Sequence, residues 1–260
     1  MTNKLITEKV LSIIRSAHKA NDDDLKLLRN ELIEVLNEAG PKQFVTVIAE
    51  IMKDKFRVEN CSDIRIPLKR LFSVSLEEAE EAVERKNYGL PEDHPISTLL
   101  REHLLNIYRL KRMKPLLEKA VKVVLDESVL TQLKEINVYF IELDSHIRKE
   151  EEVLFPALVE RGMKEHPDTL KEEHKKFKEI ISETVDAINK RGTKEQLTFN
   201  KKITQFNNEF LPGMANHIFR ETYILYPAAI EFIPENSSWS QLKKRFNTIE
   251  KSDLKSLFPQ

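Results

Sequence analysis

Apolar positions in the chain recur at spacings of three and four residues, and four long stretches keep this pattern. The stretches cover residues 96–125, 129–160, 167–191 and 195–233. This spacing places the apolar side chains on one face of an α-helix. The breaks between the stretches are short, and short links force consecutive helices to pack antiparallel. The pattern therefore predicts an all-α fold built on an up-down-up-down four-helix bundle.

The residues before the bundle predict a smaller helical region. A helix over residues 25–39 should end at Gly40, because glycine readily adopts the left-handed conformation that closes a helix, and Pro41 should open the next helix. Two further helices are expected over residues 63–72 and 76–87. A packing or dimerisation role is favoured here over a second catalytic site, and the sequence allows a homodimer through this region.

Glycine and proline divide the chain into three predicted parts. The segment NYGLPEDHP contains one glycine, two prolines and no apolar periodicity, so it is the best domain boundary. One more helix is expected around residues 239–249. We therefore predict an N-terminal helical domain of unknown role over residues 1–90, the bundle over 91–233, and a C-terminal tail with a short helix over 234–260.

Composition narrows the class of protein. Only five glycines and 33 % charged residues favour helices over a β-sandwich or barrel, and a net charge of −1 with interspersed signs provides no basic face for nucleic acid. The single cysteine, Cys61, excludes an internal disulfide and fits a reducing compartment. The first residues lack a signal-peptide stretch, and no run reaches the roughly 20 apolar residues that cross a bilayer. We predict a cytoplasmic protein that binds neither nucleic acid nor membrane.

A fifteen-residue motif occurs twice in the bundle, 71 residues apart. The first copy, beginning at His146, is HIRKEEEVLFPALVE, and the second, beginning at His217, is HIFRETYILYPAAIE. Each copy has a glutamate four residues after its histidine, at Glu150 and Glu221. Four residues of α-helix rise about 6 Å and rotate about 40° past one turn, so the imidazole and the carboxylate leave the same face. Two such faces turned toward each other would form a site for two metal ions in the core of the bundle.

The candidate ligands lie on the apolar faces of their helices. His146 and Glu150 stand between Leu143 and Val153 on the second long helix. The fourth long helix has the same arrangement, in Phe210, Met214, His217, Glu221 and Ile224. A buried, unpaired glutamate costs several kcal/mol of desolvation. Two matched glutamates at such positions therefore indicate a shared cation.

Each of the other two long helices places one histidine inward. His103 shares the apolar face of Ile107, and His174 that of Phe177. One histidine on an apolar face is usually an ordinary core residue, but four on four helices, two with matched glutamates, favour a metal site. A ferritin-type site needs Glu-x-x-His, which is absent from this sequence. A histidine-rich site suits iron, zinc or manganese, whereas magnesium and calcium prefer oxygen ligands.

The remaining three histidines are weaker candidates. His18 lies four residues before Asp22, but in the N-terminal region without other potential ligands. His166 stands before Pro167 in a break between helices, where we expect it to be exposed to solvent. His94 precedes the first long helix, where it could cap that helix or line an entrance, and whether it is a ligand stays open.

Four segments carry a resemblance to a known family. They are REHLLNIYRL, SHIRKEEEVLFP, EEHKKF and NHIFRETYILYP, and through their order and spacing the chain resembles the hemerythrin-like, or HHE cation-binding, family. The resemblance implies a hemerythrin-like bundle that holds two iron ions, Fe2+ or Fe3+, joined by an oxo bridge; zinc or manganese is less favoured. It also implies which residues bind the two ions. The terminal ligands would be four histidines, and the two ions would be bridged by two glutamates: His103, His146, His174 and His217, with Glu150 and Glu221.

Two positions depart from the oxygen-carrying hemerythrins. Lys178 stands where the carriers have a second histidine on the third helix, and Glu221 follows its histidine by four residues where the carriers have an aspartate at five. Four histidines and two glutamates leave open positions on both ions, as a reacting centre needs. The pattern is closer to di-iron proteins of nitrosative stress and iron–sulfur cluster repair. Those proteins usually have an N-terminal cysteine pair, whereas this chain has only Cys61.

These observations predict a di-iron protein that binds or reduces a small diatomic ligand or peroxide, namely dioxygen, nitric oxide or hydrogen peroxide. Tyr139, Phe210 and Met214 are expected to screen that ligand from water. Two alternatives stay open: an iron donor for iron–sulfur cluster repair, and a gas or metal sensor that signals through the N-terminal domain. Whether the ligand is turned over, and hence whether the protein is an enzyme, is also open.

Helical geometry makes two local predictions. Glu151 and Glu152 should point away from the site, so alanine at either position should leave the metal content unchanged. The proline in each motif copy should bend its helix. Pro212 should likewise distort the fourth long helix, or that helix should begin only after Gly213.

Overall fold

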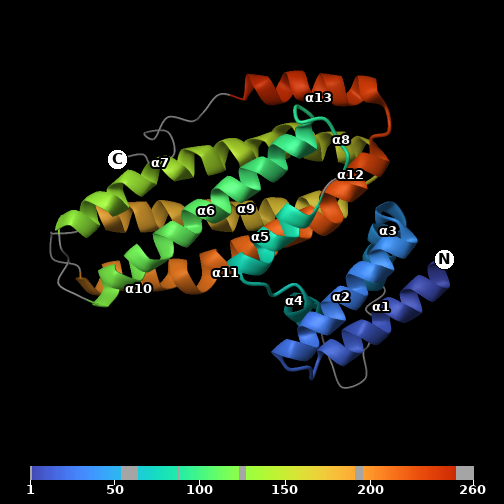
Figure 1. Ribbon diagram of the computed structural model, residues 1–260, viewed down its shortest axis with the longest axis horizontal. Coiled ribbons are helices and arrows are strands. Elements are labelled where there is room, and N and C mark those ends of the chain that lie inside the picture. Colours follow the sequence, from blue (N-terminus) through green and yellow to red (C-terminus); the bar gives the residue numbers. More distant parts are fainter. Residues whose placement is uncertain (1, 54–63, 87, 123–126, 191–195, 250–260) are drawn as a thin grey trace.

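The computed structural model describes residues 2–53, 64–86, 88–122, 127–190 and 196–249, and every regular element in these ranges is a helix. Figure 1 shows a long bundle with a group of N-terminal helices against one end and the last helix lying along its outer side. This confirms the predicted all-α fold, a bundle preceded by a smaller helical region. Cys61 lies outside the described residues.

The N-terminal helices pack around a core of their own. They are α1 (Asn3–Ala17), α2 (Asp22–Ala39), α3 (Pro41–Lys53) and α4 (Arg65–Leu71). The side chain of Asn21 caps α2 by accepting the Asp24 amide at 2.9 Å. Gly40, with φ of 83°, ends α2 as predicted, and α3 follows at once.

Helix α5 (Leu76–Arg85) lies between the N-terminal helices and the bundle. It packs against α6 and α11, and Ala79 and Val83 belong to the bundle core. Buried Arg29 of α2 ties the preceding turn in place, because its Nε donates to Leu71 O at 2.7 Å and its Nη2 to Ser73 O at 2.6 Å. The domain boundary near residue 90 stays a prediction.

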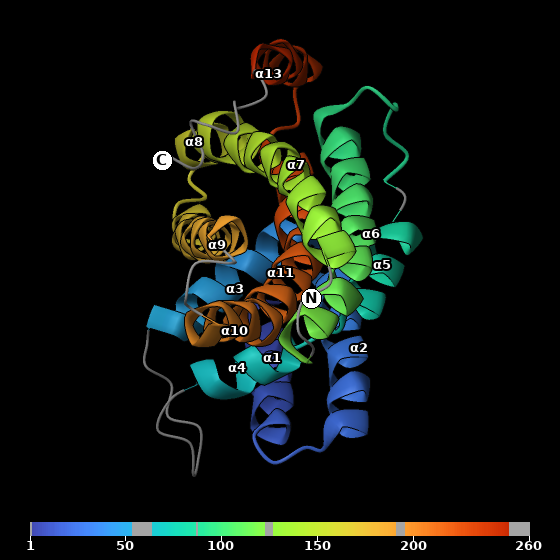
Figure 2. The same ribbon diagram turned by 90° about the vertical axis from the view of Figure 1, so that its left-hand side faces the viewer.

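Four long helical stretches form the bundle, which Figure 2 shows end-on. They are α6 (Pro95–Lys122); α7 (Glu127–Lys149), η1 (Glu150–Leu154) and α8 (Phe155–Glu160); α9 (Glu165–Asn189); and α10 (Gln196–Gln205), η2 (Phe206–Phe210), α11 (Leu211–Arg220), η3 (Glu221–Leu225) and α12 (Tyr226–Phe232). Helix α6 contacts α7, α7 contacts α9, α9 contacts α10, and α10 contacts α6. Neighbours in sequence are thus neighbours in space, as short connections require.

Three π-helical turns interrupt these stretches, and each ends two residues before a proline. In η1 the Phe155 amide donates to the carbonyl of Glu150, five residues earlier, and η3 repeats this from Tyr226 to Glu221. Proline has no N–H, and its ring clashes with the carbonyl four residues before it, so a wider turn relieves the clash. The third turn, η2, comes before Pro212, which confirms the predicted distortion. The alternative that this helix begins after Gly213 is wrong.

Each π-turn in a motif copy frees backbone carbonyls, and neighbouring elements donate to them. The hydroxyl of Tyr88 donates to the carbonyl of Thr222 in η3. Helix α13 (Asn236–Thr248) lies against α6 and η1, and Arg245 Nη2 donates to the carbonyl of Glu152 at 2.6 Å. The predicted C-terminal helix therefore covers the first motif copy.

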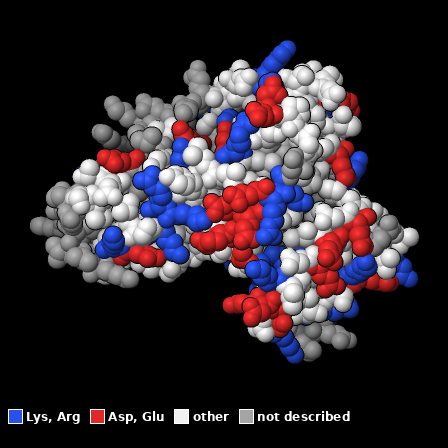
Figure 3. All heavy atoms as spheres, viewed as in Figure 1, with Lys and Arg blue, Asp and Glu red and all other residues white. Residues whose placement is uncertain are grey.

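The surface carries charges of both signs. On the face shown in Figure 3, acidic side chains gather where α5 lies, and basic side chains flank them. No helix among the described residues is both long and apolar enough to cross a membrane.

Candidate metal centre

All six predicted ligands meet in the middle of the bundle. Their atoms form two overlapping groups, each of four ligand atoms within 4.8 Å of one another. Position A consists of His103 and His146, position B consists of His174 and His217, and both positions share Glu150 and Glu221. Each of the six residues is at most 3 % exposed.

The two glutamates lie between the positions. Glu150 Oε2 is 3.7 Å from His146 Nε2 of position A and 3.5 Å from His174 Nε2 of position B. Glu221 is arranged the same way, with Oε2 3.0 Å from His103 Nε2 and Oε1 2.9 Å from His217 Nε2. Each carboxylate therefore reaches one histidine of each position, which is the arrangement that a carboxylate bridging two ions requires.

Three of the four histidines are oriented by carboxylates outside the site. His146 Nδ1 donates to Glu102 at 3.0 Å, His174 Nδ1 to Glu151 at 3.0 Å, and His217 Nδ1 to Glu173 at 2.9 Å. We call Glu102, Glu151 and Glu173 the outer carboxylates. Each also pairs with a cation, in turn Lys149, Lys178 and Arg220. A histidine held through Nδ1 presents Nε2 as the ligand, and such partners raise its basicity toward a metal.

Several buried atoms of the site are left without hydrogen bonds. Both oxygens of Glu221 and Oε2 of Glu150 have no hydrogen-bond partner in the part of the chain that the structure describes, because the nearby imidazole nitrogens are close but not aligned for one. The Nε2 atoms of His174 and His217 face each other at 2.8 Å, so a proton or a metal cation must lie between them. Ligands bound at about 2.0–2.2 Å to one ion lie within about 4.4 Å of one another. The residues present therefore fit an ion at each position after a small contraction.

Protons compensate the buried charge when no metal is bound. Burial lowers the pKa of His103 and of His174 to about 4. Burial also lowers the pKa of His217, but Glu221 and Glu173 outweigh it and raise that pKa to about 9. Burial and the nearby charge of Glu221 raise the pKa of Glu150 well above its ordinary value. Metal binding must displace these protons, as ligand sets of this kind require.

Aromatic rings cover the histidines. Tyr226 stacks on His103 with ring centroids 5.4 Å apart, and its hydroxyl donates to Glu150 Oε1 at 2.8 Å. Phe155, at the matching place in the first motif copy, stacks on His174 at 5.9 Å. Position A therefore has a hydroxyl beside it where position B has a hydrocarbon ring.

A second aromatic contact needs a glycine. The ring of Phe177 meets His217 edge-on at 5.4 Å, and a Cβ added at Gly213 would lie 3.0 Å from that ring. Glycine at 213 thus leaves room for Phe177 beside the site. Phe210 and Met214 are buried as expected, whereas Tyr139 is only partly buried, at the edge of the core.

The other histidines lie outside both ligand groups. The expectation that His166 is exposed is wrong, because α9 begins at Glu165; His166 is half-buried, and burial lowers its pKa to about 4. His94 caps α6, since its Nδ1 accepts the Ile96 amide at 3.2 Å, and it lies against Trp239. His18 is half-buried in the N-terminal region.

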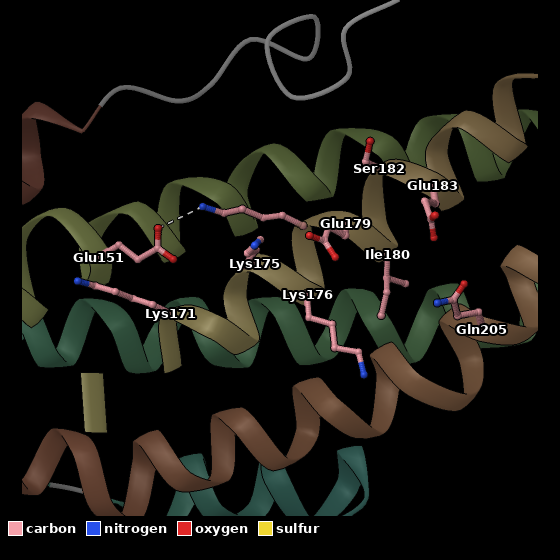
Figure 4. Close-up of a pocket in the computed structure, with 10 residues that line it drawn as sticks. Glu151, Lys171, Lys175, Lys176, Glu179, Ile180, Ser182, Glu183 and Gln205 are labelled. Atoms are coloured by element: carbon pink, nitrogen blue, oxygen red, sulfur yellow. Dashed lines mark hydrogen bonds and ion pairs between the residues drawn. The ribbon is translucent and has the colours of Figure 1, made fainter. Parts of the chain in front are cut away.

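A groove of about 870 Å³ leads from solvent to the outer carboxylate of position B. Its lining includes Glu151 and the lysines of α9, and Figure 4 shows Glu151 at one end beside Lys171. Lys178 is 39 % exposed and turns outward to Glu151 Oε2 at 3.3 Å. The position where oxygen carriers have a further histidine thus contributes no ligand to either group.

The comparison with protein families agrees with this geometry. The family model of the hemerythrin HHE cation-binding domain matches residues 94–229. The chain belongs to the hemerythrin HHE family. The match spans α6 through most of α12, which carry all six candidate ligands. No curated protein and no solved structure matches the chain.

Sequence reasoning missed the residues around the ligands. The prediction that Glu151 points away from the site is wrong, because its side chain reaches across to His174 of α9. Glu152 does point outward, where it pairs with Arg148. The roles of Tyr226 and the outer carboxylates depend on contacts between helices, which periodicity within one helix does not show.

Proposed function

We propose that this HHE protein is a non-haem di-iron protein that binds or reduces a small diatomic ligand or peroxide, such as dioxygen, nitric oxide or hydrogen peroxide. The observation that carries the proposal is that Glu150 and Glu221 each reach one histidine of each position. Two histidines and the two shared carboxylates supply about four of the six ligands that iron commonly takes, so open positions remain. Bound irons would supply redox chemistry at those positions.

The chain itself holds the ligands still and keeps water away. Outer carboxylates fix the rings of His146, His174 and His217, so these Nε2 atoms need little reorganisation on binding a metal. Phe155 and Phe177 cover the histidines of position B. The Tyr226 hydroxyl is the one donor of the described residues that bonds directly to a bridging glutamate, and it holds Glu150 Oε1 beside position A.

Anaerobic metal analysis with optical spectra before and after oxygen tests this proposal. Protein prepared with iron available should contain about two irons per chain and gain charge-transfer absorption from an oxo-bridged pair on oxidation. Nitric oxide and peroxide should each alter that spectrum. A content near zero or one iron would contradict the proposal, and preferential retention of zinc or manganese would redirect it to another metal.

A sensor is the second candidate, and a specific contact favours it. The N-terminal core includes Ile224, three residues after Glu221, and the Lys42 amide donates to Glu231 Oε2 of α12 at 2.8 Å. The N-terminal helices thus touch the helix that carries a bridging ligand. For a sensor, ligand binding should change hydrogen exchange in α1–α4, or the oligomeric state, without turnover. Steady turnover with no such change would favour the enzyme.

A further inference from the structure

One offset relates the two halves of the site. His174 lies 71 residues after His103, and His217 lies 71 residues after His146. The same separation relates the outer carboxylates Glu102 and Glu173. The cations follow the same rule, since Lys149 pairs with Glu102 and Arg220 with Glu173. The centre is therefore a pseudo-symmetric pair of metal positions.

The symmetry fails at the outer partner of one histidine. In position B, His174 Nδ1 donates to Glu151. The residue 71 positions after Glu151 is Thr222, which is fully buried. Among the described residues, neither His103 Nδ1 nor Thr222 Oγ1 has a hydrogen-bond partner. Lys178 pairs with Glu151, but the residue 71 positions before Lys178 is the buried, uncharged Ile107.

The two positions therefore differ in how firmly their ligands are held. Position B has a charged carboxylate behind both histidines, whereas position A has one behind His146 and, within the described ranges, none behind His103. Loss of an outer partner of a metal-binding histidine typically weakens metal binding about 10- to 100-fold. The same shared glutamates serve both positions, so they do not offset this difference.

We propose that position B retains its ion and that position A is the exchangeable position, beside the Tyr226 hydroxyl. This rests on the proposed function, since it assumes that both positions bind metal. The rate of metal release from the loaded protein is the quantity that compares the two positions. The ion at A should leave about 10- to 100-fold faster than the ion at B, by the effect of one outer partner.

Protein loaded with two equivalents of zinc tests the inference. A chromogenic chelator should remove zinc in two phases of equal amplitude. Crystals soaked in chelator until half the zinc is gone should show anomalous scattering at His174 and His217, and little at His103 and His146. Glu151→Thr gives position B the outer residue that position A has, so it should accelerate the slow phase about 10- to 100-fold and bring the phases together. Glu152→Thr is the matched control, because Glu152 pairs only with Arg148 among the described residues and should leave both phases unchanged.

The outcomes separate this inference from the proposed function. Equal residual scattering at both positions, or scattering at A alone, would overturn the inference and leave a two-metal site in place. Protein that takes up no metal would overturn the proposed function and the inference with it. If Glu151→Thr fails to fold, as circular dichroism would show, the half-depleted crystals of the unmodified protein still decide the question.

Discussion

The two motif copies fold alike but meet different neighbours. Each starts a π-turn at its bridging glutamate, and each π-turn is followed by a proline. The first copy is covered by α13, whose Arg245 donates to a carbonyl of η1. The second copy packs against α3 and α5, and the hydroxyl of half-buried Tyr88 donates to the Thr222 carbonyl of η3. The repeat therefore sets the ligand geometry of both candidate positions, whereas the elements that cover the two copies differ.

The largest expected effect comes from the bridging glutamate that each motif copy contains. Glu150→Ala and Glu221→Ala should each remove at least one of the two metals, because each glutamate reaches a histidine of both positions. Metal analysis of purified variants measures this, with Glu152→Ala as the control that should keep both metals. If only one of the two substitutions lowered the metal content, the two motif copies would not contribute equally to metal binding.

A change of pH should act in opposite directions on the buried histidines of the metal-free protein. The pKa of His103 and of His174 is about 4, against 6.5 for an ordinary histidine, so only the unfolded chain takes up their protons between those values. The free energy of unfolding should therefore fall as pH drops from 6.5 toward 4. His217, with a pKa of about 9, acts in the opposite sense. Its stabilising contribution is fully present below pH 6.5 and is lost as pH rises toward 9.

Denaturant unfolding of metal-free protein between pH 4 and 9 measures both effects. His217→Gln should remove the loss of stability on the alkaline side. The loss on the acid side should remain, because burial is the main cause of the lowered pKa of His103 and of His174. A stability that did not vary over this range would show that these histidines are not buried as described.

A smaller effect is expected from the residue that distinguishes position A. Tyr226→Phe removes the donor to Glu150 Oε1 and should lower the free energy of unfolding of the metal-free protein by about 1–3 kcal/mol. The variant should still bind two metals, since Tyr226 is in neither ligand group. Tyr139→Phe is the control, because Tyr139 is partly exposed at the core edge, and its effect should stay within about 0.5 kcal/mol. Loss of a metal from Tyr226→Phe would make the tyrosine a ligand.

The smallest effects should come from the donors to the freed carbonyls. Tyr88→Phe leaves a carbonyl of η3 without its donor and should cost about 0.5–1.5 kcal/mol of unfolding free energy. Arg245→Met should cost less, within about 0.5 kcal/mol, because water can reach the exposed carbonyl of Glu152. Thermal unfolding of both variants shows which substitution costs more stability. A larger cost for Arg245→Met than for Tyr88→Phe would contradict the expectation that water replaces the Arg245 donor.

Local pattern was sufficient to predict the bundle and its six candidate ligands. A histidine and a glutamate four residues apart on an apolar face must point into a helical core, whatever that face packs against, and the repeat doubled the signal. The ends of the helices were predicted less accurately. Helix α9 begins two residues earlier than its periodicity indicated, and this moved His166 from an expected loop into the first turn of a helix.

The sequence by itself determined the helices, their order and the residues that turn inward, because these follow from the period of the α-helix and from short connections. Only the tertiary structure decided which outer carboxylate holds which histidine. Glu102 and His146 lie 44 residues apart, and Glu173 and His217 are separated by the same distance. Such pairs form between helices, through long side chains whose direction depends on the packing angle. That is why the different surroundings of His174, which has Glu151 as its partner, and of His103, which has none among the described residues, become visible only once the helices are assembled.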